Sequence, residues 1–598
     1  MGNWPPAGLY TRESLEKEGK RLLDLLKDCS SVEQARKRIF DWVKDREFDP
    51  RQGNQDLLPS EVIRVRDCAM AFAGMVSATS DQRSGFSVAQ ALWDIVQGRD
   101  RTDLQAGFFA EMIHLIQGVE GRVPFHAPDE SRLDPGMDGR EASLIRSDEL
   151  DRIWEAAEAQ MLRYEDGLGD EAVERRRRRR DRILGVLGGR PEDWDDWRWQ
   201  VGHSITGAEE IAKVVRMSDE EREVIAKARD CHLPFGVTPY YASLMDEEAS
   251  GRDRAVRAQV LPPKRYVDKM AEHRRERSRM FDFMGEFYTS PIDLVTRRYP
   301  AILILKPYNT CPQVCVYCQR NWEIDEAMDP DALAPWDKIQ DALDWIRDHA
   351  SIREVLITGG DPLTLENDAV KRILDAVAAN PRVDVIRLGS RTPVTVPMRI
   401  TKALADLLGS YREPGRREIC LVTHVEHPYE ITPEMVTAID RLKRRGINVF
   451  NQQVYTFFTS RRFESARLRM LLRRVGIDPY YTFVAKGKDE TNDYRVPMAR
   501  MLQEQREEAR LLPGIRRTDE VVYNVPRLGK SHARAYQHRD LIGVLGDGSR
   551  VYKFHPWEKN IVQRENYIGS DVSILDYLQR LAAVGENPDD YNSIWYYF

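Results

Sequence analysis

From about residue 300 onward, short apolar runs alternate with amphipathic helical segments, and this alternation limits the fold more than any other feature of the chain. Strand-like character marks the runs that begin at residues 301, 354, 383, 419, 447 and 479. Strands that alternate with helices pair in parallel through right-handed crossovers. The pattern predicts an α/β fold, and it fits either an open sheet or a barrel.

In both kinds of α/β fold, ligands bind at the carboxyl ends of the strands. Cys311, Cys315 and Cys318 follow the first run directly, in the stretch NTCPQVCVYCQR. A structural zinc site needs four ligands, and Cys420, the one other cysteine of this region, lies inside a predicted strand. Seven cysteines in 598 residues do not resemble a disulfide framework. We therefore expect a metal centre with three thiolate ligands and one open position.

The spacing CxxxCxxC after the first strand resembles the radical S-adenosylmethionine (radical SAM) superfamily. This resemblance implies a partial (β/α)6 TIM-like barrel, and a [4Fe–4S] cluster whose fourth iron binds S-adenosylmethionine. The stretch LITGGDPL fits the second strand end, although a tight strand-to-helix turn would also explain its glycines. The positions that match the S-adenosylmethionine site are Gly359, Gly360, Asp361, Ser390, Arg391 and His424.

More closely, about residues 194 to 555 resemble the lysine 2,3-aminomutase family, for example in RRYPAILIL, IRLGSRTPVTVPMRIT and THVEHPYEIT. The resemblance implies pyridoxal phosphate as a further cofactor. Lys530 in EVVYNVPRLGKSHAR matches the lysine that bonds to it, although the glycine run there is one residue short. Arg298, Tyr299 and Gln452 match pyridoxal phosphate contacts, and Arg320 matches the arginine that holds the substrate's α-carboxylate.

Two further positions bear on the substrate. Lysine 2,3-aminomutases neutralise the substrate's ε-ammonium with two aspartates, and the matching residues here are Lys486 and Asn524. Lys486 would repel an ammonium group and attract a carboxylate. The same pair is associated with glutamate 2,3-aminomutases, so the resemblance implies interconversion of L-glutamate and β-glutamate. If the loop AKGKDETNDYR is displaced along the chain relative to the family, Lys488 or Asp489 faces the substrate in place of Lys486.

Other functions stay open at this point. The chain could be a lysine or arginine 2,3-aminomutase, a relative that acts on protein lysines, or an iron–sulfur redox sensor. The resemblance also implies an electron donor such as flavodoxin or ferredoxin, and a homo-oligomer. Lysine 2,3-aminomutases of the clostridial type carry a zinc-binding cysteine cluster near their C-terminus. No cysteine follows Cys420 here, so we expect no zinc.

The length predicts several domains. We expect a mainly helical accessory region over 1–190, a helical arm over 191–295, the barrel over 296–512, and a segment over 513–598 that carries Lys530. Six arginines run from Arg175 to Arg180, and the acidic residues that flank them favour a solvated helix end over a nucleic-acid site.

The net charge of -7 argues against bulk affinity for nucleic acid or anionic membranes. No apolar run reaches the length of a membrane span, and the first residues lack the order of a secretory signal. We therefore expect a cytoplasmic protein.

Overall fold

The computed structural model describes residues 4–6, 8–52, 55–123, 133, 134, 136–247, 251–276, 280–485, 488–556 and 566–598. Its centre is a curved sheet of nine strands that follow one another in chain order. Strands β2 to β8 are parallel, and β1 and β9 add antiparallel edges. The strands are β1 (Val295–Thr296), β2 (Ile302–Tyr308), β3 (Glu354–Gly359), β4 (Val385–Gly389), β5 (Glu418–Thr423), β6 (Asn448–Val454), β7 (Asp478–Ala485), β8 (Glu520–Val525) and β9 (Gly529–His532).

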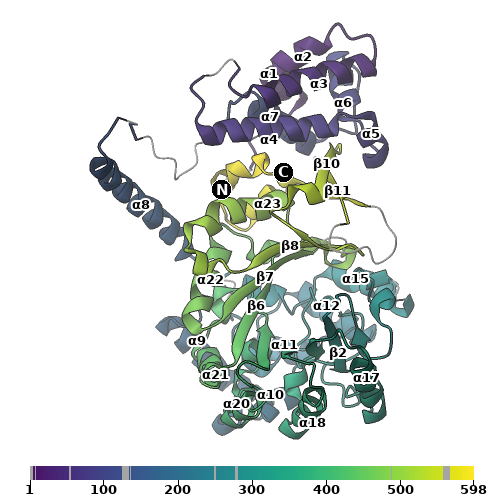
Figure 1. Ribbon diagram of the computed structural model, residues 1–598, viewed down its shortest axis with the longest axis vertical. Coiled ribbons are helices and arrows are strands. Elements are labelled where there is room, and N and C mark those ends of the chain that lie inside the picture. The colour runs from purple at the N-terminus through teal and green to yellow at the C-terminus, as the bar shows by residue number, and fades with distance from the viewer. Residues whose placement is uncertain are drawn as a thin grey trace.

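Amphipathic helices cover the outer face of this sheet (Figure 1). In α18, the buried residues Val370, Ile373, Leu374 and Val377 follow the three- and four-residue spacing of one helix face. They join the large apolar core that also contains the strands. The main crossover helices are α17 (Trp336–Asp348), α18 (Asn367–Ala378), α20 (Lys402–Gly409), α21 (Pro433–Lys443) and α22 (Glu464–Val475).

The partial (β/α)6 barrel expected from the sequence is confirmed, because the six predicted runs correspond to β2 to β7. The sheet extends further than the barrel repeat alone. After α23 (Met498–Gln503), β8 adds a seventh parallel strand, and β9 turns back along it. This extension carries Lys530 to the edge of the sheet.

Shorter helices pack beside the barrel as an arm. They are α10 (Trp197–Gly202), α11 (Ala208–Val214), α12 (Asp219–Asp230), α13 (Pro239–Ala242), α14 (Arg254–Ala258) and α15 (Lys264–Glu272). Helix α9 (Asp170–Leu187) belongs to the same core and carries the arginine run. Arg176 and Arg179 are buried, and Arg179 pairs with Asp246 at 2.9 Å, so the expectation of a solvated run holds only for the outward residues.

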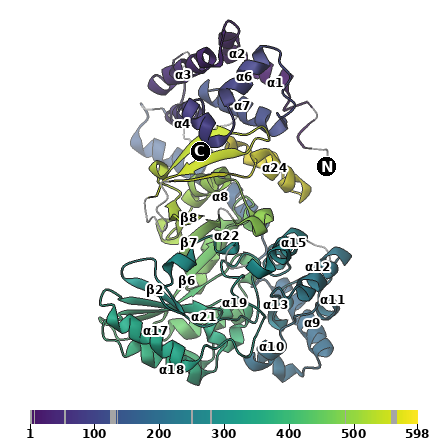
Figure 2. The ribbon, with the colours of Figure 1, turned by 90° about the vertical axis from the view of Figure 1, so that its right-hand side faces the viewer.

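The first seven helices and the C-terminal end of the chain form one body, whose apolar core is continuous with β7, β8 and α23 (Figures 1 and 2). Their partners are a second sheet, together with α24 (Ile574–Ala583) and the 3-10 segment η13 (Pro588–Tyr596). The helices are α1 (Arg12–Glu18), α2 (Lys20–Leu26), α3 (Val32–Phe48), α4 (Pro59–Met75), α5 (Ala78–Ser84), α6 (Val88–Val96) and α7 (Ala106–Val119). The second sheet contains β10 (Arg539–Val544), β11 (Arg550–Phe554) and β12 (Tyr567–Ser570). The mainly helical N-terminal region is thus confirmed.

Two contacts explain how closely these parts fit. Glu111 of α7 accepts hydrogen bonds from Arg550 of β11 at 3.0 and 3.1 Å, and both side chains are buried. A Cβ atom at Gly107 would lie 2.1 Å from the carbonyl oxygen of Asp547, so only glycine allows this approach of helix to turn. Helix α8 (Gly139–Met161) connects this body to α9.

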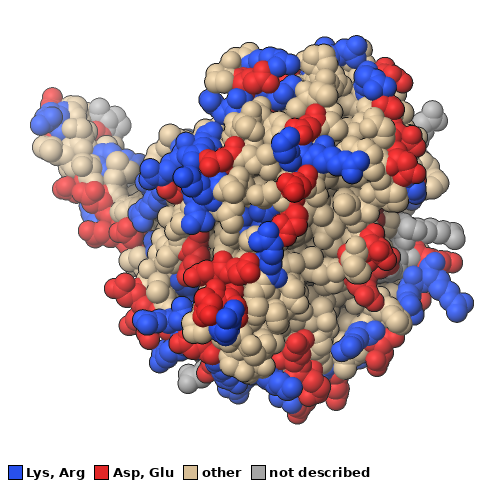
Figure 3. Space-filling model, turned by 90° about the horizontal axis from the view of Figure 1, so that it is seen from below, with Lys and Arg blue, Asp and Glu red and all other residues tan. Residues whose placement is uncertain are grey.

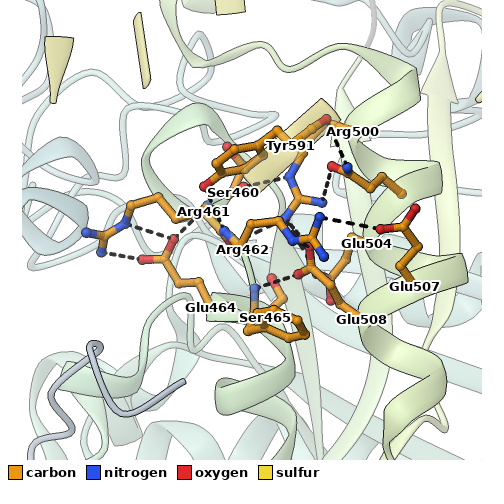
Figure 4. Close-up of polar contacts among 12 residues, drawn as sticks. Ser460, Arg461, Arg462, Glu464, Ser465, Arg500, Glu504, Glu507, Glu508 and Tyr591 are labelled. Carbon is orange, nitrogen blue, oxygen red and sulfur yellow. Dashed lines mark hydrogen bonds and ion pairs between the residues drawn. The ribbon is translucent and has the colours of Figure 1, made fainter. Parts of the chain in front are cut away.

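A buried ionic network ties the C-terminal end to the barrel (Figure 4). Arg500 of α23 pairs with Glu508 at 2.8 Å and donates to the carbonyl oxygen of Ser460 at 2.9 Å. Arg462 pairs with the same Glu508 at 2.9 Å, and its backbone N–H donates to the hydroxyl of Tyr591 in η13. Removing one member would leave a buried charge without its partner, so we expect this network to be costly to disrupt.

The surface gives no sign of a large single-sign field on the side seen in Figure 3, where basic side chains lie among acidic ones. In the described part of the chain, no helix is both long and apolar enough to cross a membrane.

Candidate active site

A cavity of about 710 Å³ is lined by the carboxyl ends of the barrel strands and extends along them to Ile302 and Glu354, the first residues of β2 and β3. With Lys486 excepted, it brings together every residue that the sequence predicts for the site. They are Arg298, Tyr299, Cys311, Cys315, Cys318, Arg320, Gly359, Gly360, Asp361, Ser390, Arg391, His424, Gln452, Asn524 and Lys530.

The three cysteines lie in the loop after β2 and are free thiols. Burial raises the pKa of all three, and for Cys311 and Cys318 the charge of a neighbouring thiolate raises it further. Two N–H groups point at these sulfurs: Nη1 of Arg391 lies 2.9 Å from Sγ of Cys315, and the backbone nitrogen of Arg320 lies 3.3 Å from Sγ of Cys318. Such donors favour the thiolate form that a metal needs.

Arg391 is the centre of a buried polar network behind the cysteine loop. It pairs with Glu430 at 2.7 Å, and its Nε donates to the carbonyl oxygen of His424 at 3.1 Å. It also donates to the side chains of Tyr241 and Gln259, which come from the helical arm. Burial lowers the pKa of His424 to about 4, and the charge of Arg391 lowers it too. His424 is therefore neutral at physiological pH.

The GGD stretch at the end of β3 packs against the start of the cysteine loop. A Cβ at Gly360 would lie 2.0 Å from the carbonyl oxygen of Thr310, and Gly359 has a φ of +119°. The carboxylate of Asp361 accepts from Ser390 at 2.6 Å and from the backbone N–H of Arg391 at 2.9 Å. The glycines therefore bring two strand ends together as well as lining the cavity, and Asp361 joins β3 to β4.

Lys530 lies on β9, where it faces the cavity beside aromatic rings. Its amine donates to the hydroxyl of Tyr299, and it lies 4.7 Å from the ring centre of Tyr299 and 5.3 Å from that of Tyr481. Asn524 of β8 is the register partner of Lys530. A primary amine held in this way can reach an aldehyde bound in the cavity.

Arg320 and Arg298 share a carboxylate that the sequence did not predict. Glu286, in the 3-10 segment η3 (Glu286–Thr289), lies 2.9 Å from Nη2 of Arg320 and 3.2 Å from Nη2 of Arg298. Lys306 approaches the same group at 3.4 Å. Burial raises the pKa of Glu286, but these three cations outweigh it and lower the pKa to about 2.

Lys486 lies outside the described residues. The residue before it, Ala485, is the register partner of Asn524. The alternative Lys488 is buried and pairs with Glu490, and its amine lies 3.3 Å from the carbonyl oxygen of Cys318. The charge of Lys488 is thus already compensated, and Lys488 is absent from the described wall of the cavity.

The residues of the cavity fit the groups that the sequence implies. Across the described residues, no set of three or more His, Cys, Asp and Glu side chains could hold a single metal ion. An iron–sulfur cluster spreads its thiolates over separate irons, and its positive irons would offset the cost of burying three thiolates. Gln313 in the same loop is 4% exposed and lines the cavity, and neither polar atom of its amide has a hydrogen-bond partner. A bound polar ligand would satisfy this amide.

Sequence reasoning missed the residues that act behind the cavity wall, chiefly Glu286, Gln259, Tyr241 and Glu430. Glu426 is another, and burial raises its pKa to about 8 although Arg391 opposes the shift. Glu426 and Glu430 do stand in the THVEHPYEIT stretch, so the position of carboxylates just after a strand was the available signal. No local pattern marks Glu286 or Gln259.

Comparison with known proteins agrees with this geometry. The Radical SAM superfamily model matches residues 305–502. An uncharacterised KamA family protein of Methanocaldococcus jannaschii is 42% identical over 96% of both chains. The glutamate 2,3-aminomutase of Clostridioides difficile is 30% identical over 68% of this chain and 91% of its own. The L-lysine 2,3-aminomutase of Clostridium subterminale is 31% identical over 52% of this chain and 71% of its own.

Proposed function

Because the chain belongs to the KamA family and is a radical SAM aminomutase, we propose that it interconverts L-glutamate and β-glutamate with pyridoxal phosphate as a further cofactor. Family membership implies the [4Fe–4S] cluster and S-adenosylmethionine. When bound, the three cofactors supply the chemistry that moves an amino group between adjacent carbons. The protein supplies binding, orientation and exclusion of water.

The charge of the cavity wall is the observation that carries the proposed substrate. The described wall contains two acidic residues, Glu354 and Asp361. Glu354 pairs with Arg387, and Asp361 accepts hydrogen bonds from Ser390 and from backbone N–H groups. Neither carboxylate is available to an ε-ammonium group, whose burial without a partner would cost several kcal/mol, on the order of the penalty for an unpaired buried charge.

Cationic groups, in contrast, are abundant in the wall. Arg298, Arg320, Arg387, Arg391 and Lys530 all line the cavity. Arg387 and Arg391 already pair with Glu354 and Glu430. The cations that a substrate carboxylate and a cofactor phosphate would meet are therefore Lys530 and the two arginines that share Glu286, Arg298 and Arg320. A lysine substrate would add a further cation to them. The electrostatics therefore favour a dicarboxylic amino acid.

Pyridoxal phosphate is supported by the position of Lys530. The lysine and Tyr299 are in contact within the cavity, and Arg298 is an adjacent cation suited to a phosphate. Gln452 of β6 also lines the cavity and offers an amide. In our proposal the amine of Lys530 binds the cofactor before the amino acid enters. After the amino acid has displaced it, the free amine of Lys530 carries the proton that the amino acid releases.

Two-ended anchoring is the proposed role of the substrate-binding residues. Arg320 binds the α-carboxylate, and Asn524 together with Lys486 binds the second carboxylate. Holding a short substrate at both ends restricts it to the geometry in which hydrogen transfer is productive. The anchors should therefore affect turnover as well as binding.

The main alternative is a lysine or arginine 2,3-aminomutase, or a relative that acts on protein lysines. An iron–sulfur sensor is disfavoured because a sensor has no use for an aldehyde-reactive lysine in the same cavity. We also propose a flavodoxin- or ferredoxin-type reductant, a homo-oligomeric state and a cytoplasmic location, with no nucleic-acid partner.

Anaerobic reconstitution tests the substrate. The protein would be loaded with iron, sulfide, S-adenosylmethionine, pyridoxal phosphate and a reductant, and offered glutamate, aspartate, lysine and arginine in parallel. We expect β-glutamate from glutamate, detected by mass spectrometry after derivatisation. A β-amino acid from lysine alone would show that the alternative is correct.

A further inference from the structure

Glu286 has three cationic partners, and two of them belong to the cavity wall. Its Oε1 atom lies 2.9 Å from Nη2 of Arg320 and 3.2 Å from Nη2 of Arg298. Its Oε2 atom lies 3.2 Å from Nε of Arg320 and 3.4 Å from Nζ of Lys306. Glu286 itself is 5% exposed and is not part of the described wall.

These distances decide which part of Arg320 remains for a ligand. A guanidinium group offers a carboxylate two edges, one formed by Nε and Nη2 and the other by Nη1 and Nη2. Glu286 occupies the first edge through both of its oxygens. Among the described residues, no hydrogen bond or ion pair uses Nη1 of Arg320. A carboxylate that enters the cavity can therefore bind Arg320 end-on, through Nη1 and the second N–H of Nη2.

The segment that carries Glu286 is itself fixed in place. Gly285, which precedes it, has a φ of +70°, and the carboxylate of Asp282 accepts from the backbone N–H of Glu286 at 2.7 Å. Nearby, the carbonyl oxygen of Phe283 accepts from the backbone N–H of Arg527, in the turn between β8 and β9. The segment is thus tied to the turn that leads to Lys530.

We propose that Glu286 is the positioning residue of the carboxylate site: it occupies one edge of Arg320, leaves the other for the substrate, and fixes Arg320 relative to Arg298. This inference rests on the proposed function in one respect, since it takes Arg320 as the residue that binds the substrate's α-carboxylate. Glu286 acts through the two arginines and does not touch the ligand.

Two consequences of removing the charge of Glu286 point in opposite directions. Glu323, which lies 2.7 Å from Lys306 and 3.8 Å from Arg320, would remain as a carboxylate partner of these two cations. The added positive charge strengthens attraction for a substrate carboxylate. The same change frees the first edge of Arg320, so a carboxylate can bind in more than one orientation, and most of these orientations are unproductive.

The test compares binding and turnover in Glu286→Gln, which keeps the size of the side chain and removes its charge. Binding is measured without reductant, by following the absorbance of pyridoxal phosphate during titration with glutamate and, separately, with lysine. We expect the dissociation constant for the bound amino acid to fall at least threefold while kcat for the substrate falls at least tenfold.

Glu286→Asp is the second variant, because it keeps the charge and shortens the reach. We expect a dissociation constant within about twofold of the parent and a kcat several-fold lower. The matched control is Glu192→Gln, which removes an exposed carboxylate that pairs with Arg190 on the surface. Iron content and thermal midpoint are measured for each variant, so that a folding defect is recognised.

Weaker binding in Glu286→Gln, or unchanged binding with unchanged kcat, would overturn the inference. Arg320→Met separates this outcome from failure of the proposed function. If Arg320→Met binds glutamate and lysine as tightly as the parent, Arg320 is not the anchor and the proposed site is wrong. If it loses binding, the result for Glu286→Gln judges the positioning role alone. The titration still gives the change in dissociation constant if the parent isomerises neither amino acid, and weaker binding in Glu286→Gln would then overturn the inference by itself.

Discussion

Asn524 and Lys530 are register partners on the antiparallel strands β8 and β9, and both line the cavity. The residue proposed to bind the far carboxylate therefore stands directly across from the lysine proposed to hold pyridoxal phosphate. Ala485, at the end of β7, is in turn the partner of Asn524. The proposed site for the end of the substrate that distinguishes glutamate from lysine thus includes a residue of the strand next to the one that carries Lys530.

Exchanging both far-end residues for aspartate should reverse the charge preference. In Lys486→Asp with Asn524→Asp, a substrate carboxylate would meet two like charges, so we expect kcat/KM for glutamate to fall at least hundredfold, equivalent to about 2.7 kcal/mol. The measurement is initial-rate kinetics with glutamate, with lysine as the second substrate. Unchanged β-glutamate production would contradict the assignment of these residues.

Replacing Lys530 should remove the covalent attachment of pyridoxal phosphate. In Lys530→Ala, borohydride reduction should label no peptide with the cofactor, and turnover should fall by a factor of about a thousand or more, since a positioned nucleophile is lost. Lys402→Ala, on the exposed start of α20, is the control. Labelling of another lysine at full yield in Lys530→Ala would identify a different cofactor residue.

Gly360→Ala should disturb the cysteine loop without touching a cysteine. The new Cβ would lie 2.0 Å from the carbonyl oxygen and 2.4 Å from the nitrogen of Thr310, one residue before Cys311. The loop must shift, so we expect iron content after reconstitution to fall by half or more. Gly185→Ala in α9 has open space around its Cβ and should keep full iron content. Equal iron content in the two variants would show that the loop tolerates the shift.

The stability of the N-terminal body should depend on pH through His114. Burial lowers the pKa of His114 to about 3, and the charge of Arg550 lowers it too. Because the unfolded chain binds a proton below about pH 6.5 and the folded protein does not, this residue contributes stability that is lost as the pH falls from about 6.5 towards 3. Between pH 6.5 and 4.5 the loss should reach about 2 kcal/mol.

His114→Phe provides the measurement, because phenylalanine keeps a ring to stack on Trp595 and cannot titrate. Urea unfolding at each pH should show a shallower decline for the variant than for the parent. The variant will be less stable at pH 7, since the hydroxyls of Tyr10 and Tyr596 lose a partner. Parallel pH profiles for the two proteins would mean that His114 is protonated in the folded state.

Much of the barrel could be predicted from the sequence, because both signals that define it are local. Strand periodicity gave the six runs, and three cysteines within eight residues gave the metal loop. The cavity residues followed from positions at strand ends, where parallel strands bring them to one edge.

The residues behind the cavity wall and the packing of the N-terminal helices could not be predicted, because they depend on contacts between segments that are distant in the sequence. Gln259 and Arg391 are 132 residues apart in the chain, and Glu111 and Arg550 are 439 residues apart. No periodicity or spacing reveals such pairs, since each partner looks like an ordinary polar residue of its own helix or strand. The arginine run shows the same limit, because burial of Arg176 and Arg179 depends on what packs against α9.

Isotope transfer tests the central claim most directly. The reconstituted protein would be given L-glutamate with deuterium at C3, together with S-adenosylmethionine, pyridoxal phosphate and a reductant under anaerobic conditions. We predict that deuterium appears in 5′-deoxyadenosine and at C2 of the β-glutamate formed, both measured by mass spectrometry. Deuterium transfer from labelled lysine but not from labelled glutamate would contradict the account.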